Sequence, residues 1–197
     1  MFDTVVAFEQ RVAHYFGAAQ GVAVDCCTHA LELCLRLQGT TITSVPAHTY
    51  LSVPMTMSKL GISWDFVDLA WQDHYHIGGT NIIDAAAFWQ PQGYIAGTYM
   101  CLSFQFKKHL NLGRGGMILT DHNDSAAELR KMSYDGRDGS APWSTQDVRT
   151  LGYHYYMTPE TAQQGMDRFD HACASPPRSW SWQDYPDLRT MSVFSDQ

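Results

Sequence analysis

The sequence has no long apolar run and no excess of positive charge. Its 197 residues contain no uninterrupted hydrophobic stretch near the roughly 20 residues that a membrane-spanning helix needs. Residues 1–10 alternate apolar and charged side chains, unlike a secretory signal peptide. The 13 Lys and Arg against 20 Asp and Glu give a formal net charge of -7, which disfavours nonspecific nucleic-acid binding. We therefore expect a cytoplasmic protein that binds neither membranes nor nucleic acid.

Cysteines are few, and none of them forms a Cys-x-x-Cys pair. The chain has five, an odd number, and Cys26 and Cys27 are adjacent. This spacing indicates neither a disulfide framework nor a zinc ribbon, so we expect reduced thiols. His74 and His76 could bind a metal from one strand face, but no Cys, His or carboxylate partner lies at a convincing spacing.

Regular hydrophobic periodicity is present along most of the chain. Hydrophobic residues make up 45% of the sequence and charged residues 17%, as in one ordinary globular domain. After an opening amphipathic helix, strand and helix patterns alternate, which predicts a three-layer α/β fold with a mostly parallel sheet. The predicted helices are 4–16, 30–37, 48–59, 124–132 and 158–169, and the predicted strands are 21–24, 41–45, 63–67, 81–83, 99–104 and 117–120.

Two segments lack this periodicity. Residues 134–150 are rich in Gly, Ser and Asp and form a predicted loop of a length usually reserved for function or flexibility. Residues 171–197 contain prolines and tryptophans and are too aromatic for a linker, so we expect this tail to lie across another surface. The sequence thus predicts a domain over residues 1–170 and a C-terminal tail over 171–197.

The most informative motif is SFQFKKHLNLGRGG at residues 103–116, where a predicted strand runs into a Lys pair and a Gly-rich turn. It resembles the cofactor-lysine motif of the DegT/DnrJ/StrS family of pyridoxal-phosphate-dependent sugar aminotransferases. In that family a Ser stands five residues before the lysine that forms the Schiff base, and a Gly-x-Gly-Gly turn begins five residues after it. This spacing selects Lys108, which would hold the cofactor and act as the base, and makes Lys107 a solvated neighbour.

Two N-terminal segments extend the resemblance. VAVDCCTHAL at residues 22–31 is similar to the family's strand followed by Gly-Thr-x-Ala-Leu. The match implies that Thr28, the backbone amides of Thr28 and His29, and the hydroxyl of Ser103 bind the cofactor phosphate at a helix N-terminus. PAHTY at 46–50 resembles a Pro-x-x-Thr-aromatic stretch, which implies that Tyr50 stacks on the pyridine ring.

Two further segments complete the implied site. NIIDAA at residues 81–86 resembles the strand whose aspartate meets the pyridine nitrogen, which assigns that role to Asp84. GYHYYMT at 152–158 is similar to a segment that reaches the cofactor of the neighbouring subunit, with His154 where Asn is usual. The resemblance therefore implies the aspartate aminotransferase fold, a homodimer, and amino transfer from glutamate to a nucleotide-linked keto-sugar.

The sequence also departs from the family pattern. Cys27 replaces the phosphate-loop Gly, Ala87 stands where Gln or His is common, Arg114 replaces an acidic residue and Tyr156 replaces Arg. Family members are usually much longer and carry a C-terminal small domain, and residues 67–81 are compressed here. The resemblance is therefore to a shortened member of the family.

Other interpretations remain open from the sequence. The chain could be a binding or regulatory module that retains the cofactor fold without turnover, or a plain structural α/β domain. A related sugar dehydratase is a third alternative, but such enzymes replace the lysine with histidine, and His109 is one position out of register. Each predicted site residue also has an ordinary structural interpretation: a helix or strand cap for Thr28 and Asp84, a backbone-bonded hydroxyl for Ser103, a core aromatic for Tyr50, a surface lysine for Lys108, and a packed or surface histidine for His154.

Overall fold

The computed structural model describes residues 2–139 and 141–195. The chain opens with helix α1 (Asp3–Phe16), which confirms the predicted amphipathic helix. Phe8, Val12 and Phe16 lie on one face and are fully buried, because residues three and four apart share a helix face. The helix ends at Gly17, whose positive φ of 79° is a conformation that glycine adopts without strain.

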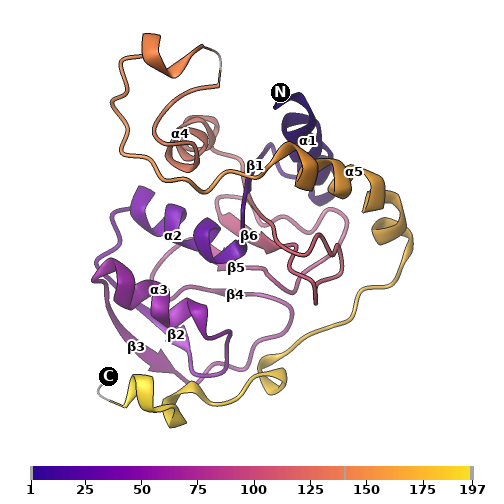
Figure 1. Cartoon of the computed structure of the whole chain (residues 1–197). Coiled ribbons are helices and arrows are strands. Elements are labelled where there is room, and N and C mark those ends of the chain that lie inside the picture. Colours follow the sequence, from indigo (N-terminus) through magenta and orange to yellow (C-terminus); the bar gives the residue numbers. More distant parts are fainter. Residues whose placement is uncertain (1, 140, 196–197) are drawn as a thin grey trace.

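A five-stranded sheet forms the centre of the molecule (Figure 1). Only the β5–β6 pairing in this sheet is parallel among the described strands, and the other three pairings are antiparallel. The predicted mostly parallel sheet is therefore wrong. In spatial order the strands are β1 (Gln20–Val24), β7 (Gly116–Thr120), β6 (Tyr99–Ser103), β5 (Ile82–Asp84) and β4 (Tyr75–His76).

The connections explain the strand directions. β6 and β7 are joined by a Gly-rich turn with no crossover helix, so they pair antiparallel. The predicted β-α-β unit does form, from β2 (Ile42–Pro46), α3 (Ser52–Leu60) and β3 (Ser63–Val67). Its two strands are parallel, but they make a separate two-stranded sheet. Hydrophobic periodicity identified the strands without showing which strands would pair.

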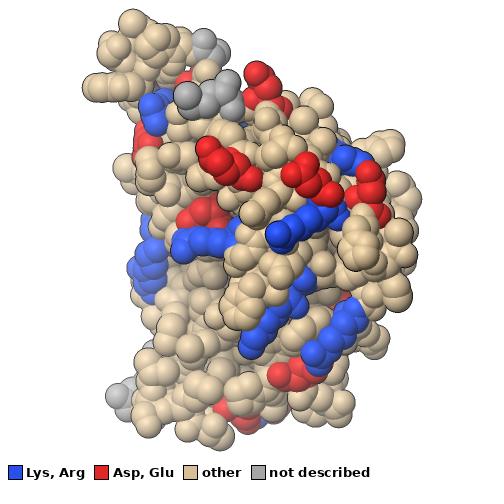
Figure 2. Space-filling view, turned by 45° about the vertical axis from the view of Figure 1, so that its right-hand side comes forward, with Lys and Arg blue, Asp and Glu red and all other residues tan. Residues whose placement is uncertain are grey.

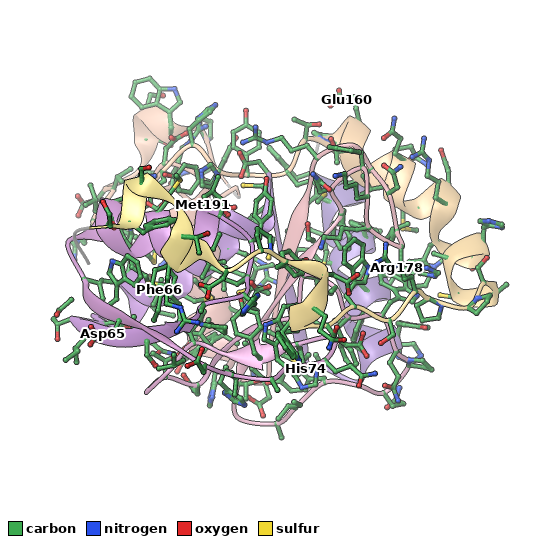
Figure 3. All side chains as sticks on the ribbon, turned by 90° about the horizontal axis from the view of Figure 1, so that it is seen from below. Asp65, Phe66, His74, Glu160, Arg178 and Met191 are labelled. Carbon is green, nitrogen blue, oxygen red and sulfur yellow. The ribbon has the colours of Figure 1, made fainter. Side chains whose placement is uncertain are left out.

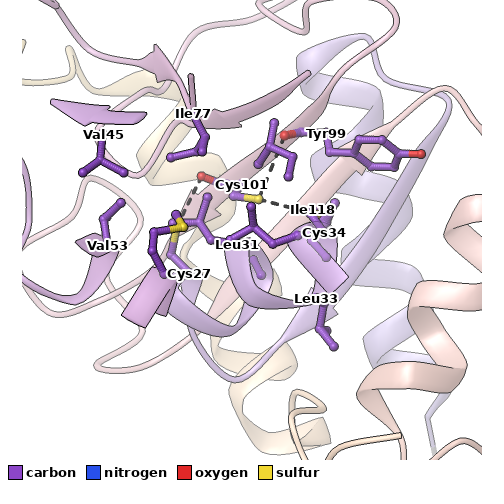
Figure 4. Close-up of a cluster of buried hydrophobic side chains, with 14 of the residues drawn as sticks. Cys27, Leu31, Leu33, Cys34, Val45, Val53, Ile77, Tyr99, Cys101 and Ile118 are labelled. Carbon is purple, nitrogen blue, oxygen red and sulfur yellow. Dashed lines mark hydrogen bonds between the residues drawn. The ribbon is translucent and has the colours of Figure 1, made fainter. Parts of the chain in front are cut away.

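Helices cover both faces of the central sheet, which confirms the layered α/β arrangement. Alternate residues of β7 enter different cores: Ile118 packs with one cluster, and Met117 and Leu119 with the other. The first cluster lies under α2 and includes the buried thiols of Cys34 and Cys101 (Figure 4). The second lies under α1 and α5. The remaining helices are α2 (Cys27–Leu37), α4 (Asn123–Ser133) and α5 (Pro159–Ala174).

The C-terminal tail lies across the molecule. It runs from Arg178 past Met191 to the β2–β3 sheet (Figure 3), where the ring of Phe194 lies 5.6 Å from that of Phe66 of β3, measured between centroids. The backbone amide of Leu188 donates to the carbonyl of Ala47 at 2.9 Å, and the Leu188 side chain is 1% exposed. The tail contains three short 3-10 helices, Trp182–Asp184, Leu188–Thr190 and Ser192–Phe194, and a fourth, Trp143–Thr145, lies in the 134–150 loop.

The surface carries charges of both signs. On the face shown in Figure 2, lysine and arginine side chains lie among acidic and uncharged residues, without one continuous basic band. Within residues 2–139 and 141–195, no helix is both long and apolar enough to cross a membrane.

Candidate functional site

Lys108 lies in the turn between β6 and β7. The turn closes through backbone hydrogen bonds, including one from the amide of Lys108 to the carbonyl of Gln105 at 2.8 Å. Lys108 is half-buried, whereas Lys107 is exposed. The ammonium of Lys108 lies 5.1 Å from the ring centroid of Trp180, a tail residue. The two adjacent lysines thus differ in their exposure to solvent.

Asp84 ends strand β5 and is buried. Its Oδ1 accepts a hydrogen bond from the backbone amide of Ala86 at 3.0 Å, and its Oδ2 accepts one from the hydroxyl of Tyr75 at 2.6 Å. Burial raises the pKa of Asp84, while these donors and the charge of Lys108 oppose that shift. Burial likewise lowers the pKa of Lys108, and the charge of Asp84 opposes it. The two side chains are therefore an electrostatically coupled acid and base.

A cavity of about 300 Å³ opens beside Lys108. Ser103, at the end of β6, also lines it, and its hydroxyl accepts a hydrogen bond from the amide of Gln105 at 3.4 Å. The wall opposite the turn comes partly from the tail, through Arg178 and Trp180. Lys108, Ser103 and the residues directly after Asp84 thus meet at one hollow.

The N-terminus of α2 carries the predicted phosphate residues. Its N-cap, Cys26, is extended and makes no side-chain capping bond. β7 approaches this turn so closely that a Cβ at Gly116 would lie 2.5 Å from the carbonyl carbon of Cys26, which explains the glycine there. The hydroxyl of Thr28 is hydrogen-bonded to that of Ser52 at 2.7 Å. Cys27 is buried and its thiol contacts the carbonyl of Cys101 at 3.4 Å (Figure 4).

The His29 side chain belongs to a small ionic cluster beside this turn. Its Nδ1 bonds to Asp25 at 2.6 Å, and the same carboxylate accepts a hydrogen bond from Arg114 at 2.7 Å. The imidazole stacks on Tyr155, with ring centroids 3.6 Å apart. Burial opposes protonation of His29, but the hydrogen bonds to Asp25 and Cys26 outweigh it and raise the pKa of His29 to about 9.

Of the predicted site residues, Lys108 and Ser103 line the cavity, and Thr28, His29, Tyr50, Asp84 and His154 do not. The Tyr50 side chain is 58% exposed. His154 is also exposed and pairs with Asp135, whose carboxylate lies 3.1 Å from Nδ1. The cofactor and catalytic roles of these seven residues stay predictions.

Three aromatic residues that interact with Asp84 or Lys108 belong to none of the sequence motifs. Tyr75 lies in the compressed segment between β3 and β5, on a strand of two residues that gives no periodic signal. Trp180 and Tyr185 lie in the tail, where aromatic content was the available signal. Tyr185 packs against the first hydrophobic cluster, and burial together with the charge of Asp84 raises its pKa.

The sequence matches the DegT/DnrJ/EryC1/StrS aminotransferase family over residues 1–85 and 85–175. The chain therefore belongs to this family of pyridoxal-phosphate-dependent aminotransferases. This match confirms the family that the sequence motifs indicate.

This chain covers only part of the length of each relative that it matches. The chain is 42% identical over 62 residues to 3-amino-5-hydroxybenzoate synthase of Amycolatopsis mediterranei (strain S699), which is 30% of this chain and 16% of that protein. AtS13 of Actinomadura melliaura has a similar fold, with a TM-score of 0.76, 21% identity, and coverage of 87% of this chain and 60% of AtS13. The sugar aminotransferase CalS13 of Micromonospora echinospora gives a TM-score of 0.69 at 16% identity, covering 87% of this chain and 61% of CalS13. The chain thus spans about 60% of the length of these two structures.

Lys108 and Ser103, which line the cavity, and the buried Asp84, which interacts electrostatically with Lys108, fit the reactive end of the cofactor. A carboxylate offers about four acceptor positions, and Asp84 uses two of them, so it can accept a further donor such as a protonated ring nitrogen. Among the described residues Lys108 forms no salt bridge, and burial lowers its pKa, which eases loss of the proton that a nucleophilic amine must give up. Ser103 adds a hydroxyl to the same hollow.

Proposed function

We propose that this chain is an aminotransferase that binds pyridoxal phosphate through Lys108 and transfers an amino group from glutamate to a nucleotide-linked keto-sugar. One arrangement carries the proposal: the half-buried Lys108 lines a cavity, and its amine interacts electrostatically with the buried carboxylate of Asp84. Family membership supports the same chemistry, and the fold similarity to the sugar aminotransferase CalS13 supports a sugar as the acceptor.

Each residue has a defined part in this proposal. When bound, pyridoxal phosphate supplies an aldehyde that condenses with amines and a ring that withdraws electrons from the substrate. The Nζ of Lys108 would hold the aldehyde carbon and, once released, carry a proton to and from the substrate carbon. Asp84 would accept a hydrogen bond from the ring nitrogen, and Ser103 and the N-terminus of α2 at Thr28 would receive the phosphate.

A titration with pyridoxal phosphate, followed by visible absorbance, tests the cofactor assignment. We expect a saturable band from the lysine-bound cofactor in the wild type and in Lys107→Ala, and no such band in Lys108→Ala. Lys107→Ala is a matched control because it removes an adjacent, exposed lysine. A band that survives in Lys108→Ala would refute the assignment of Lys108.

A second candidate is a module that binds the cofactor without turnover. It is favoured by the tail, because Trp180 lies over the Lys108 ammonium and Arg178 narrows the same cavity. Adding glutamate to the cofactor-loaded protein separates the two functions. An aminotransferase loses the visible band and releases 2-oxoglutarate, whereas a binding module does neither.

The proposal includes a homodimer in which residues 134–157 approach the site of the second subunit. Two large apolar side chains of this region are exposed in the single chain, Trp143 at 66% and Leu151 at 77%. Such residues are costly to leave in water and suit a subunit contact. Sedimentation of the purified chain should give the mass of a dimer, and a monomer at micromolar concentration would exclude this part of the proposal.

A further inference from the structure

Asp84 is held by a chain of buried hydroxyl groups that the family motifs do not include. Tyr75 donates its phenolic proton to Asp84 Oδ2 at 2.6 Å, and the Tyr75 oxygen is itself hydrogen-bonded to the hydroxyl of Thr49. All three side chains are at most 6% exposed. Because Tyr75 already donates its proton to Asp84, Thr49 is the donor to Tyr75. The hydrogen bonds thus run from Thr49 through Tyr75 to the carboxylate.

Strand register creates this contact. β4 pairs antiparallel with β5, and Tyr75 lies directly opposite Asp84. Side chains of directly opposed residues in an antiparallel pair project from the same face of the sheet, so the phenol reaches the carboxylate. The short strand β4 therefore places a hydrogen-bond donor at Asp84, whose charge acts on Lys108.

The surroundings of Asp84 make this donor important. Five titratable groups act on it or feel its charge: Tyr75 from β4, Cys27 from α2, Cys101 from β6, Lys108 from the turn after β6, and Tyr185 from the tail. Burial raises the pKa of the tyrosines and cysteines in this group, so they stay neutral at neutral pH. Lys108 is then the one member of these five that can carry a positive charge. A buried carboxylate with so little compensation needs hydrogen-bond donors to stay ionised.

We propose that Tyr75, fixed by Thr49, is a positioning residue that keeps Asp84 ionised and thereby sets the protonation of Lys108. A hydrogen bond to the ionised form of an acid lowers its affinity for protons. Without the phenol, Asp84 takes up a proton more readily and no longer attracts the ammonium of Lys108. The amine then loses its proton at a lower pH. The use of this coupling in amino transfer rests on the proposed function, whereas the coupling itself is a property of the cofactor-free chain.

Competitive acetylation of the cofactor-free, full-length protein tests the inference. The rate of Lys108 labelling is measured from pH 6 to 10 by mass spectrometry, with Lys107 as the internal reference. We expect Tyr75→Phe to increase Lys108 labelling at pH 7.5 by on the order of threefold to tenfold and to move its pH midpoint downward. Asp84→Asn should move the midpoint in the same direction, and Lys107 should not change.

Controls separate this effect from a general loosening of the fold. Tyr99→Phe removes another buried phenol, which donates to Ser125 at 2.8 Å on a different part of the sheet, and should leave the Lys108 profile unchanged. If Tyr75→Phe does not fold, Thr49→Val provides the second variant and should give a smaller downward shift. An unchanged Lys108 profile in the folded variant would overturn the inference. Because no cofactor is present, that outcome is distinct from failure of the pyridoxal phosphate titration.

Discussion

At the scale of single residues, surroundings separate side chains that the sequence places together. Lys107 and Lys108 are adjacent and chemically identical, yet Lys107 is exposed, whereas Lys108 is half-buried with its ammonium 5.1 Å from the ring centroid of Trp180. Motif spacing predicts Lys108 as the cofactor lysine, and in the structure Lys108 is the less exposed of the two. Tyr75 could not be selected in this way, because its contact with Asp84 depends on strand pairing between residues nine apart in sequence.

His29 makes a pH-dependent contribution to stability. Its pKa is raised to about 9 in the folded chain, from 6.5 for the free side chain, so the folded state binds its proton more tightly. The stabilisation is complete below pH 6.5 and is lost as the pH rises towards 9. We expect the wild type to lose about 1–2 kcal/mol more than His29→Gln between pH 6.5 and 9, measured by urea unfolding. Equal losses in the two proteins would show that the His29–Asp25 bond does not stabilise the fold.

At the scale of helices and strands, the sequence predicted local structure better than strand pairing. The five predicted helices and six predicted strands all occur, although α3 begins at Ser52 and not at residue 48. Two features were not predictable from local pattern. β4 is too short to show alternation, and the direction of β7 depends on the turn that precedes it and on its pairing with β1 and β6. Periodicity reports which residues are buried, not which strand lies beside them.

The contact between α1 and α5 depends on one glycine. A Cβ at Gly165 would lie 2.5 Å from Cε2 of the Phe8 ring, a residue with no exposed surface. Alanine is a better helix former than glycine, but here it would force the two helices apart. We expect Gly165→Ala to lower the free energy of unfolding by about 1–3 kcal/mol in urea denaturation. Gln164→Ala, on the exposed side of the same helix, is the control and should change it little. A stabilised Gly165→Ala protein would contradict this close packing.

At the scale of the whole molecule, the tail links the β2–β3 sheet to the candidate site. Leu188 anchors it in the first hydrophobic cluster, and Trp180 covers Lys108 at the other end of the same segment. Between them, the amide of Trp182 donates to the carbonyl of Trp71 at 3.1 Å. The tail is therefore part of the folded domain as well as a wall of the cavity, and its anchoring and the exposure of Lys108 should change together.

Leu188→Ala tests this connection. Removing a fully buried leucine side chain should cost about 2–4 kcal/mol of unfolding free energy, because the cavity left behind adds to the lost burial. The same variant should make the tail more susceptible to limited proteolysis and increase acetylation of Lys108 relative to Lys107. Val193→Ala removes an apolar side chain that is 61% exposed in the same tail, and it should change neither stability nor labelling appreciably. If Leu188→Ala behaves like Val193→Ala, the tail is not anchored at Leu188. If stability falls while Lys108 labelling stays the same, Trp180 does not shield Lys108. The position of Trp180 would then no longer favour a module that binds the cofactor without turnover.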